Sequence, residues 1–295
     1  MVLFSILGPL EIYSEKTGTT SPGEGSFQDT LLITLLSARG RVFPAGVLID
    51  ELWGQAPPSN PVNALQAHIS RLRRKLRGLE PDRPHGRLAL MPLSGYRLDV
   101  LDEEVDAQLF LAEAAALERE AGTLPPEQVV ARVGQALRRW RGPALGGIVG
   151  GPICQESARL YEQARLRVLE IRFDAELALG RHGAIIGELT ELVIARSSFR
   201  ERYCEQLMTA LYRSGRQAEA LEIYRHAREQ VGEAAGTGPS RALRDHERAV
   251  LEHDSILEAP DTGTVRTLAG SRRRTAAAAA PGHRPSEGGR SFARL

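Results

Sequence analysis

The sequence has few of the features that mark secreted or membrane proteins. Its 295 residues include two cysteines, Cys154 and Cys204, and neither belongs to a CxxC pair. No apolar run approaches the roughly 20 residues that a membrane-spanning helix requires. The N-terminal stretch MVLFSILGPLEIYSE has neither the positive segment nor the small-residue cleavage site of a signal peptide. We therefore expect a cytoplasmic protein without a disulfide framework.

The sequence also lacks the residue patterns of common catalytic and metal sites. The glycine-rich run 142-GPALGGIVGG-151 has no Lys-Ser or Lys-Thr pair to reach a phosphate and a magnesium ion. The seven histidines show neither an HExxH pattern nor paired ligand spacing. Ser94-Gly95 has no GxSxG context. We therefore predict that the protein is not an enzyme and that it holds no metal ion and no cofactor.

Lysine is almost absent, so arginine supplies nearly all of the positive charge. Lys16 and Lys75 are the only lysines among 38 basic residues, and the net charge is +1. Residues 1–100 hold 11 basic and 9 acidic side chains, residues 101–260 hold 20 and 26, and residues 261–295 hold 7 and 2. A near-neutral total therefore hides a basic first part, an acidic middle and a basic tail.

One basic stretch, 63-NALQAHISRLRRKLRG-78, has the periodicity of an amphipathic helix. Its apolar residues Leu65, Ile69, Leu72 and Leu76 recur at helical spacing and form one inward face. At about 100° per residue, the other face carries mostly polar and basic side chains: Asn63, Ala67, Ser70, Arg71 and Arg74, flanked by His68, Arg73, Lys75 and Arg77. A run of charge is often only a solvated surface. Residues 61–97, however, hold eight basic and two acidic residues, which favours a site for phosphates.

The elements around this basic helix follow the order of a winged helix-turn-helix domain. Short strands within residues 1–27 precede helical patterns at 28–40 and 44–54, then the basic helix, then a hairpin at 86–100. In such domains the third helix enters the major groove of DNA. The basic helix is therefore the expected recognition helix.

Beyond Asp102 the sequence predicts helices alone, over 106–121, 127–140, 153–179, 184–196, 200–213 and 217–231. The stretch 177-LALGRHGAIIGEL-189 resembles 212-YRSGRQAEALEIY-224 at an offset close to the tetratricopeptide period of about 34 residues. This repetition favours tetratricopeptide-like helix pairs, with an irregular helical bundle as the alternative.

The predicted fold is an α+β winged helix-turn-helix domain at residues 1–101, followed by an all-α tetratricopeptide-like helical domain at 102–258. Residues 259–295 contain Gly, Pro, Ala and Arg with almost no large apolar groups. They bury too little surface to offset the entropy of ordering, so we expect a disordered basic tail.

Segments spread along residues 1–255 resemble a single family in the family's own order. They include 4-FSILGPLEI-12, 39-RGRVFPAGVLIDELWGQAPP-58, 63-NALQAHISRLRRKL-76, 95-GYRLDV-100, 136-ALRRWRGPAL-145 and 200-RERYCEQLMTALYRSGRQAEALEIYRHAR-228. The family is that of the Streptomyces antibiotic regulatory proteins (SARPs), small relatives of the AfsR regulators. The first half resembles an OmpR-type winged helix, and the second half resembles the bacterial transcriptional activator domain.

The resemblance implies a nucleoid-associated transcriptional activator of a specialised-metabolite gene cluster, often an antibiotic cluster. Such proteins typically bind direct repeats in promoter DNA as dimers or head-to-tail pairs, and they recruit RNA polymerase through its sigma factor and α subunit. The loop that matches the family's polymerase-facing region runs from Gly54 to Pro61, with the candidates Gly54, Gln55, Ala56, Ser59 and Asn60.

We predict two groups of DNA contacts for this chain. The base-reading candidates are Asn63, Ser70, Arg71 and Arg74. The phosphate candidates are His68, Arg73, Lys75, Arg77, Arg87 and Arg97. The chain departs from the family at Gln28-Asp29-Thr30, where a basic residue is usual, and we expect one phosphate contact to be lost there.

The same features allow an alternative from another functional class, a protein-interaction adaptor. In that alternative, the helical repeats bind a partner and the winged helix no longer binds DNA. The basic cluster at residues 71–77 argues against it. A double variant, Arg71→Ala with Arg74→Ala, separates the two, because an adaptor keeps its function in this variant and an activator loses it.

Overall fold

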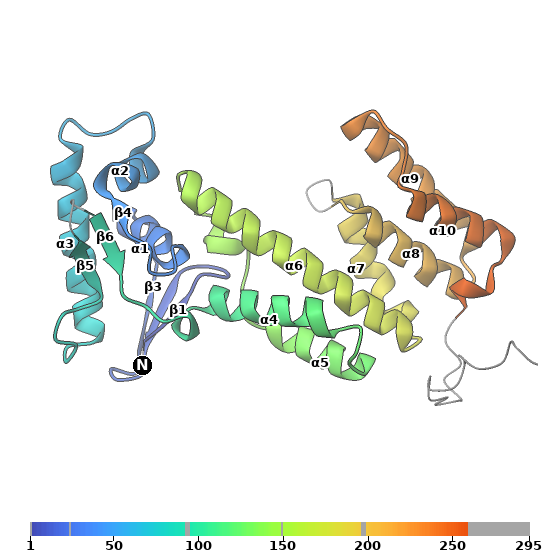
Figure 1. Ribbon diagram of the computed structural model, residues 1–295, viewed down its shortest axis with the longest axis horizontal. Coiled ribbons are helices and arrows are strands. Elements are labelled where there is room, and N and C mark those ends of the chain that lie inside the picture. Colours follow the sequence, from blue (N-terminus) through green and yellow to red (C-terminus); the bar gives the residue numbers. More distant parts are fainter. Residues whose placement is uncertain (1, 24, 92–94, 149, 196–198, 259–295) are drawn as a thin grey trace, which may run out of the picture. The chain divides into compact units, whose positions relative to one another are not determined.

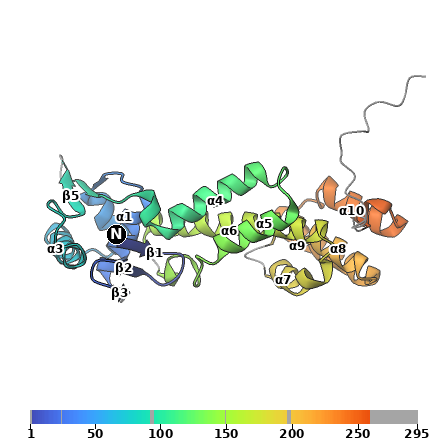
Figure 2. The same ribbon diagram turned by 90° about the horizontal axis from the view of Figure 1, so that it is seen from below.

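The computed structural model describes residues 2–23, 25–91, 95–148, 150–195 and 199–258 (Figures 1 and 2). Three short strands begin the chain: β1 (Val2–Ser5), β2 (Glu11–Ser14) and β3 (Thr19–Pro22). They form an antiparallel sheet in the order β1-β2-β3, with Phe4 opposite Ile12. Strands β1 and β2 were expected from their alternating pattern, whereas β3 was not.

Three helices and a second small sheet follow: α1 (Phe27–Ser37), β4 (Phe43–Pro44), α2 (Ala45–Trp53), α3 (Pro61–Leu79), β5 (Leu88–Met91) and β6 (Gly95–Leu98). The second sheet has the order β4-β6-β5, so the hairpin of β5 and β6 is widened by the two residues of β4. This arrangement confirms the winged helix. Most of the turn expected at 92–95 lies outside the described residues.

The rest of the described chain is helical, as expected: η2 (Asp102–Glu104), α4 (Asp106–Glu120), α5 (Pro126–Leu137), η3 (Ala144–Gly147), α6 (Pro152–Ala178), α7 (His182–Ile194), α8 (Glu201–Arg213), α9 (Gln217–Ala235), α10 (Arg241–Glu252) and η5 (Ser255–Leu257). Gly180 and Gly215, the glycines aligned by the internal repeat, both have positive φ, 71° and 74°. Only glycine adopts this conformation at little cost, which explains the tight turns before α7 and α9. No described helix combines the length and the apolar composition needed to cross a bilayer.

Two hydrophobic cores hold these elements together. The first extends from Val2 to Ala175 and contains side chains of the winged helix together with those of α4, α5 and α6. The second extends from Leu169 to Leu257 and contains side chains of α6 to α10. Helix α6 thus contributes to both cores. The boundary predicted between residues 101 and 102 stays a prediction, and the first core continues across it.

The winged helix and α6 are joined by a buried helix cap. Glu51 on α2 is 4% exposed, and its carboxylate accepts hydrogen bonds from the backbone N–H groups of Ile153 and Cys154, each at 2.8 Å. A carboxylate there also suits the positive end of the dipole of α6. The adjacent Cys154 is a free thiol, and burial raises its pKa to about 12, so it stays protonated; its sulfur lies 3.4 Å from the Thr34 hydroxyl, within hydrogen-bond distance.

Candidate nucleic-acid interface

Helix α3 forms where the sequence supplies a cap, a start and an apolar stripe. The Asn60 side chain accepts a hydrogen bond from the Asn63 N–H at 3.1 Å, and Pro61 occupies the first helical turn. The predicted stripe of Leu65, Ile69, Leu72 and Leu76 is buried, at 0% to 3% exposure. This burial fixes which side of α3 faces the core and therefore which side chains face outward.

The outward face of α3 carries positive charge that no carboxylate among the described residues neutralises. Asn63, Ser70, Arg71, Arg74 and Arg77 are all exposed. The three arginines among them have no ion-pair partner in the described part of the chain. In the helical half, by contrast, arginines on several helices pair with carboxylates: Arg132, Arg167, Arg172, Arg200, Arg202 and Arg216. An unpaired row of guanidinium groups on a groove-sized helix can bind an anionic duplex.

Lys75 and His68 flank this row, but both interact with side chains near α1. The Lys75 ammonium lies 3.6 Å from the carboxylate of Asp29, which is buried and also caps α1 through Ser26. Asp29, where the family usually has a basic residue, therefore partly neutralises the positive charge of Lys75. The His68 ring packs against Phe27 and Trp53, with ring centroids 5.4 and 5.8 Å away. Burial and the charge of Arg71 lower the pKa of His68, which favours its neutral form.

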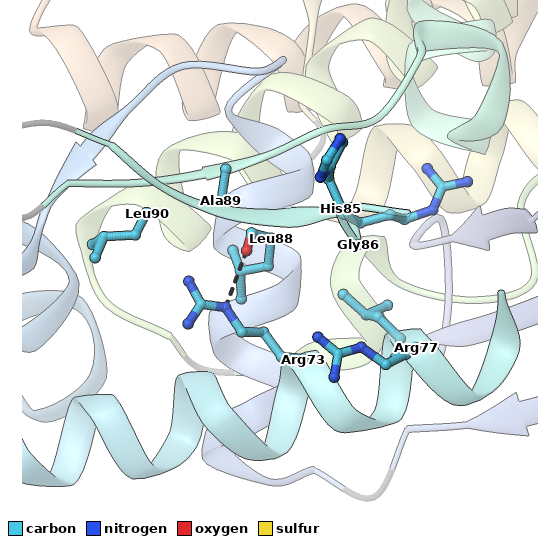
Figure 3. A pocket seen from close by; sticks show the side chains of 9 residues that line it. Arg73, Arg77, His85, Gly86, Leu88, Ala89 and Leu90 are labelled. Atoms are coloured by element: carbon cyan, nitrogen blue, oxygen red, sulfur yellow. Dashed lines mark hydrogen bonds between the residues drawn. The ribbon is translucent and has the colours of Figure 1, made fainter. Parts of the chain in front are cut away.

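A notch separates α3 from strand β5. It is a cavity of about 280 Å³ whose lining includes Arg73, Arg77, His85 and Leu90. Figure 3 shows Arg73 and Arg77 on α3, with a dashed line from Arg73 to Leu88. This line is the hydrogen bond that Arg73 Nε donates to the Leu88 carbonyl at 3.0 Å. It holds the Arg73 side chain against β5 while its two terminal nitrogens have no hydrogen-bond partner among the described residues.

Sequence reasoning missed two residues of the notch, His85 and Leu90. Leu90 is 60% exposed, which is unusual for a large apolar side chain on a strand. His85 stands just before the glycine that opens the hairpin and is also exposed. Its position at the start of the hairpin could have marked it as a candidate DNA contact, but the prediction considered only arginines in the wing. Arg97 on β6 is half-buried and lies opposite Ala89 in the hairpin.

Arg87 does not fit the prediction of a phosphate contact, because its side chain is buried. Its guanidinium is 1% exposed and lies between the carboxylates of Glu80 and Glu104, with a hydrogen bond to Glu104 at 2.6 Å. It also donates to the Asp99 carbonyl at 3.2 Å and lies over the Phe4 ring. Arg87 thus joins the end of α3, the wing, η2 and the first sheet, and its charge is neutralised inside the protein.

The loop between α2 and α3 is exposed throughout. All of the polymerase-facing candidates, Gly54, Gln55, Ala56, Ser59 and Asn60, have exposed side chains or backbone. Gly54 has a positive φ of 54°, which allows the chain to turn out of α2. The loop therefore presents an accessible surface next to the start of α3.

Known proteins match both parts of this architecture. The model of the C-terminal domain of transcriptional regulatory proteins matches residues 28–98, and that of the bacterial transcriptional activator domain matches residues 105–251. The transcriptional regulator RedD of Streptomyces coelicolor is 38% identical over 262 residues, which are 88% of this chain and 73% of RedD. The chain belongs to the SARP family of transcriptional activators.

Further relatives extend the match over the same range. The regulatory protein DnrI of Streptomyces peucetius is 36% identical over 86% of this chain and 93% of its own length. The regulatory protein AfsR of Streptomyces coelicolor is 36% identical over 92% of this chain, which spans 26% of AfsR. The solved structure of Mycobacterium tuberculosis EmbR with a low-affinity phosphopeptide has a TM-score of 0.74 at 31% identity, covering 85% of this chain and 65% of that one. The SARP fold thus accounts for both the winged helix and the helical half.

Proposed function

We propose that this SARP activator binds direct repeats in promoter DNA by placing α3 in the major groove. The exposed, unpaired arginines of α3, set opposite a buried apolar stripe, are the observation that carries this proposal. Asn63, Ser70, Arg71 and Arg74 read base edges, and a bidentate bond from an arginine to guanine O6 and N7 is the expected pairing.

Side chains around the row hold the DNA backbone. The proposed phosphate contacts are His68, Arg73, Lys75, Arg77 and Arg97. Arg87 is left out because it is buried between carboxylates. His68 contributes a neutral hydrogen bond, and Lys75 contributes only part of its charge because Asp29 is close. Each phosphate contact adds about −0.9 to the slope of log K against log salt concentration.

The relatives support a proposal for the regulated genes and for the partners. We propose that the chain acts in the cytoplasm at the nucleoid, as a homodimer on DNA, and activates a gene cluster for a specialised metabolite such as an antibiotic. The exposed loop Gly54–Pro61 contacts RNA polymerase through its sigma factor and α subunit. The accessibility of that loop, beside a helix that enters the major groove, supports this assignment.

The test compares two pairs of arginines by fluorescence anisotropy. The probes are promoter duplexes from the gene's own neighbourhood and scrambled duplexes, across a salt series. Arg71→Ala with Arg74→Ala removes two exposed arginines from α3. The matched control, Arg225→Ala with Arg228→Ala, removes two exposed arginines with the same spacing from α9; they also lack ion-pair partners in the described chain. We expect the α3 double variant to bind the promoter duplex at least about 30-fold more weakly, since each bidentate contact contributes about 1–3 kcal/mol. The control double variant should keep its affinity.

Two results would contradict the proposal. Equal binding to promoter and scrambled duplexes would leave only a nonspecific basic surface, and unchanged activity of the α3 variant in cells would favour the adaptor.

The polymerase contact has its own test in the same preparation. Gln55→Ala with Ser59→Ala should keep DNA affinity and lose transcription in a reconstituted assay with RNA polymerase.

A further inference from the structure

A second cavity, of about 280 Å³, lies in the helical half between α6, α8, α10 and η5; the three α-helices are labelled in Figure 1. Its lining combines a polar wall and an apolar wall. Three polar residues of α8, Glu205, Gln206 and Thr209, line it and are each less than a tenth exposed. Leu177 and Leu257 supply apolar surface. Buried polar side chains cost free energy unless their hydrogen bonds are made, so their partners decide what the cavity accepts.

Gln206 has a buried acceptor without a partner. Its Nε2 donates hydrogen bonds to the Glu170 carbonyl at 2.8 Å and to the Asp174 carboxylate at 2.7 Å. Both neighbours accept only, so the orientation of the Gln206 amide is fixed. Its Oε1 is buried and makes no hydrogen bond to any described residue. The oxygen is therefore enclosed by protein, and the amide serves as a fixed part of the cavity wall.

His246 on α10 supplies a hydrogen-bond acceptor at this cavity. The Thr209 hydroxyl donates its single hydrogen to the Glu205 carbonyl at 2.9 Å. Thr209 must therefore accept the hydrogen bond that joins it to His246 Nε2 at 2.8 Å. This fixes the hydrogen of the neutral ring on Nε2 and leaves Nδ1 as an acceptor, with no partner among the described residues. Burial lowers the pKa of His246, so the neutral ring is the form present at neutral pH.

The charged groups around the cavity already have partners. Arg202 bonds Asp174 and Glu205, each at 2.7 Å. Asp245 lies near Arg241 and Arg248, at 3.5 and 3.9 Å. Arg213 donates to three backbone carbonyls: those of Leu177, Leu257 and Glu258. A charged ligand would therefore have to compete with existing bonds, whereas a neutral donor would meet the free acceptor on His246.

We propose that this cavity binds a small neutral molecule that carries a hydrogen-bond donor on an apolar body. A hydroxyl or amide N–H group of the ligand bonds to His246 Nδ1, and its apolar body packs on Leu177 and Leu257. The site goes beyond DNA binding and gives the helical half a ligand of its own. Helix α6 lines this cavity with Asp174 and Leu177 and receives the Glu51 cap at its other end, so one helix contacts both the ligand and the winged helix.

The test uses the full chain labelled with 15N and resorcinol as the probe, followed by chemical-shift titration. Resorcinol is neutral and has two hydroxyls on an apolar ring, whereas benzoate and benzylamine have the same ring size and one charge each. Ala242→Trp fills the cavity from its exposed edge, and His246→Phe removes one acceptor. Ala218→Trp, on the exposed side of α9, is the matched control.

We expect saturable binding of resorcinol at one site, with a dissociation constant of about 1 mM, as befits so small a ligand. Benzoate and benzylamine should bind at least about tenfold more weakly. Ala242→Trp and His246→Phe should each weaken resorcinol binding by at least about tenfold, while Ala218→Trp leaves it unchanged. Binding that does not saturate, that is equal for the charged probes, or that persists in folded Ala242→Trp would overturn the proposal. None of these outcomes depends on whether the chain binds DNA.

Discussion

The guanidinium of Arg87 is enclosed by protein, and its loss would leave Glu104, which is 8% exposed in its side chain, without its counter-charge. Breaking a buried ion pair by removing one partner costs about 3–5 kcal/mol. We therefore expect Arg87→Met to lower the free energy of unfolding by that amount, measured by urea denaturation. Arg77→Met, at an exposed and unpaired position, should change it by less than about 0.5 kcal/mol. An equal effect of both substitutions would show that the Arg87 pairs do not stabilise the fold.

His246 should make stability depend on pH. Burial lowers its pKa in the folded chain from the ordinary 6.5, with Arg202 acting in the same direction and Glu205 opposing. Below about pH 6.5 the unfolded chain takes up a proton that the folded chain still resists, so acidification favours unfolding. The stabilisation is therefore complete above about pH 6.5 and is lost as the pH falls toward the folded pKa. Asp245 lies on the same helix as His246, and Glu205 and Arg202 act on its ring from α8.

The measurement is the thermal midpoint at about pH 8 and about pH 5.5, with the unfolded pKa of about 6.5 lying between them. His246→Gln, which keeps a polar side chain but does not titrate, should show a smaller fall than the unmodified chain. His68, whose pKa is also lowered, is present in both proteins and so cancels in the comparison. An identical fall in both proteins would assign the pH dependence to other groups.

The exposed row of α3 was predictable residue by residue, and the partners of its neighbours were not. Helical periodicity alone places Asn63, Ser70 and Arg74 opposite the buried stripe, and the structure exposes all three. Periodicity carries no information about which distant side chain meets Arg87 or Lys75. Glu104 lies 17 residues from Arg87, and only the folded chain brings the two together. Whether the exposed residues contact DNA stays a prediction until it is measured.

At the scale of elements, long periodic helices followed from the sequence and short strands did not. The helix expected at residues 63–78 was recognisable from its apolar stripe, and the structure extends it to Pro61–Leu79. Strand β4 is two residues long and exists because Phe43 pairs with Tyr96, far along the chain. Such strands form hydrogen bonds with partners that are distant in the sequence, so no local pattern predicts them. Helix α10 was not expected as a separate element. Its N-cap is Ser240, whose hydroxyl accepts a hydrogen bond from the Leu243 N–H.

The cap between α2 and α6 supports a prediction at this scale. Glu51→Gln replaces one of the two accepting oxygens with an amide that cannot accept, so one buried N–H of α6 loses its partner. We expect a loss of about 1–3 kcal/mol in the free energy of unfolding, measured by urea denaturation. Glu222→Gln, an exposed substitution on α9, should leave stability unchanged. No loss in Glu51→Gln would mean that the N-terminus of α6 is capped in another way.

At the scale of the whole molecule, the winged helix depends on residues beyond position 101. Ile6 and Leu7 are fully buried, and Asp106 accepts hydrogen bonds from both of their backbone N–H groups. Their carbonyls accept hydrogen bonds from the N–H groups of Leu145 and Arg141, each at 2.8 Å. We therefore expect the isolated fragment 1–101 to lack a cooperative thermal transition, whereas the fragment 1–258 should keep one. Cooperative unfolding of 1–101, observed by circular dichroism, would show that the winged helix is an independent domain.

The core shared by the winged helix and α4–α6 limits how this protein can be engineered to recognise a different promoter. A chimera that exchanges residues 1–101 with a relative would join two halves of a core that were shaped separately, including the Glu51 cap and the bonds to Ile6 and Leu7. The outward face of α3 is different, because its side chains contact little else in the protein. Grafting those few side chains is therefore the practical way to transfer promoter choice, and the scaffold beneath them can stay as it is.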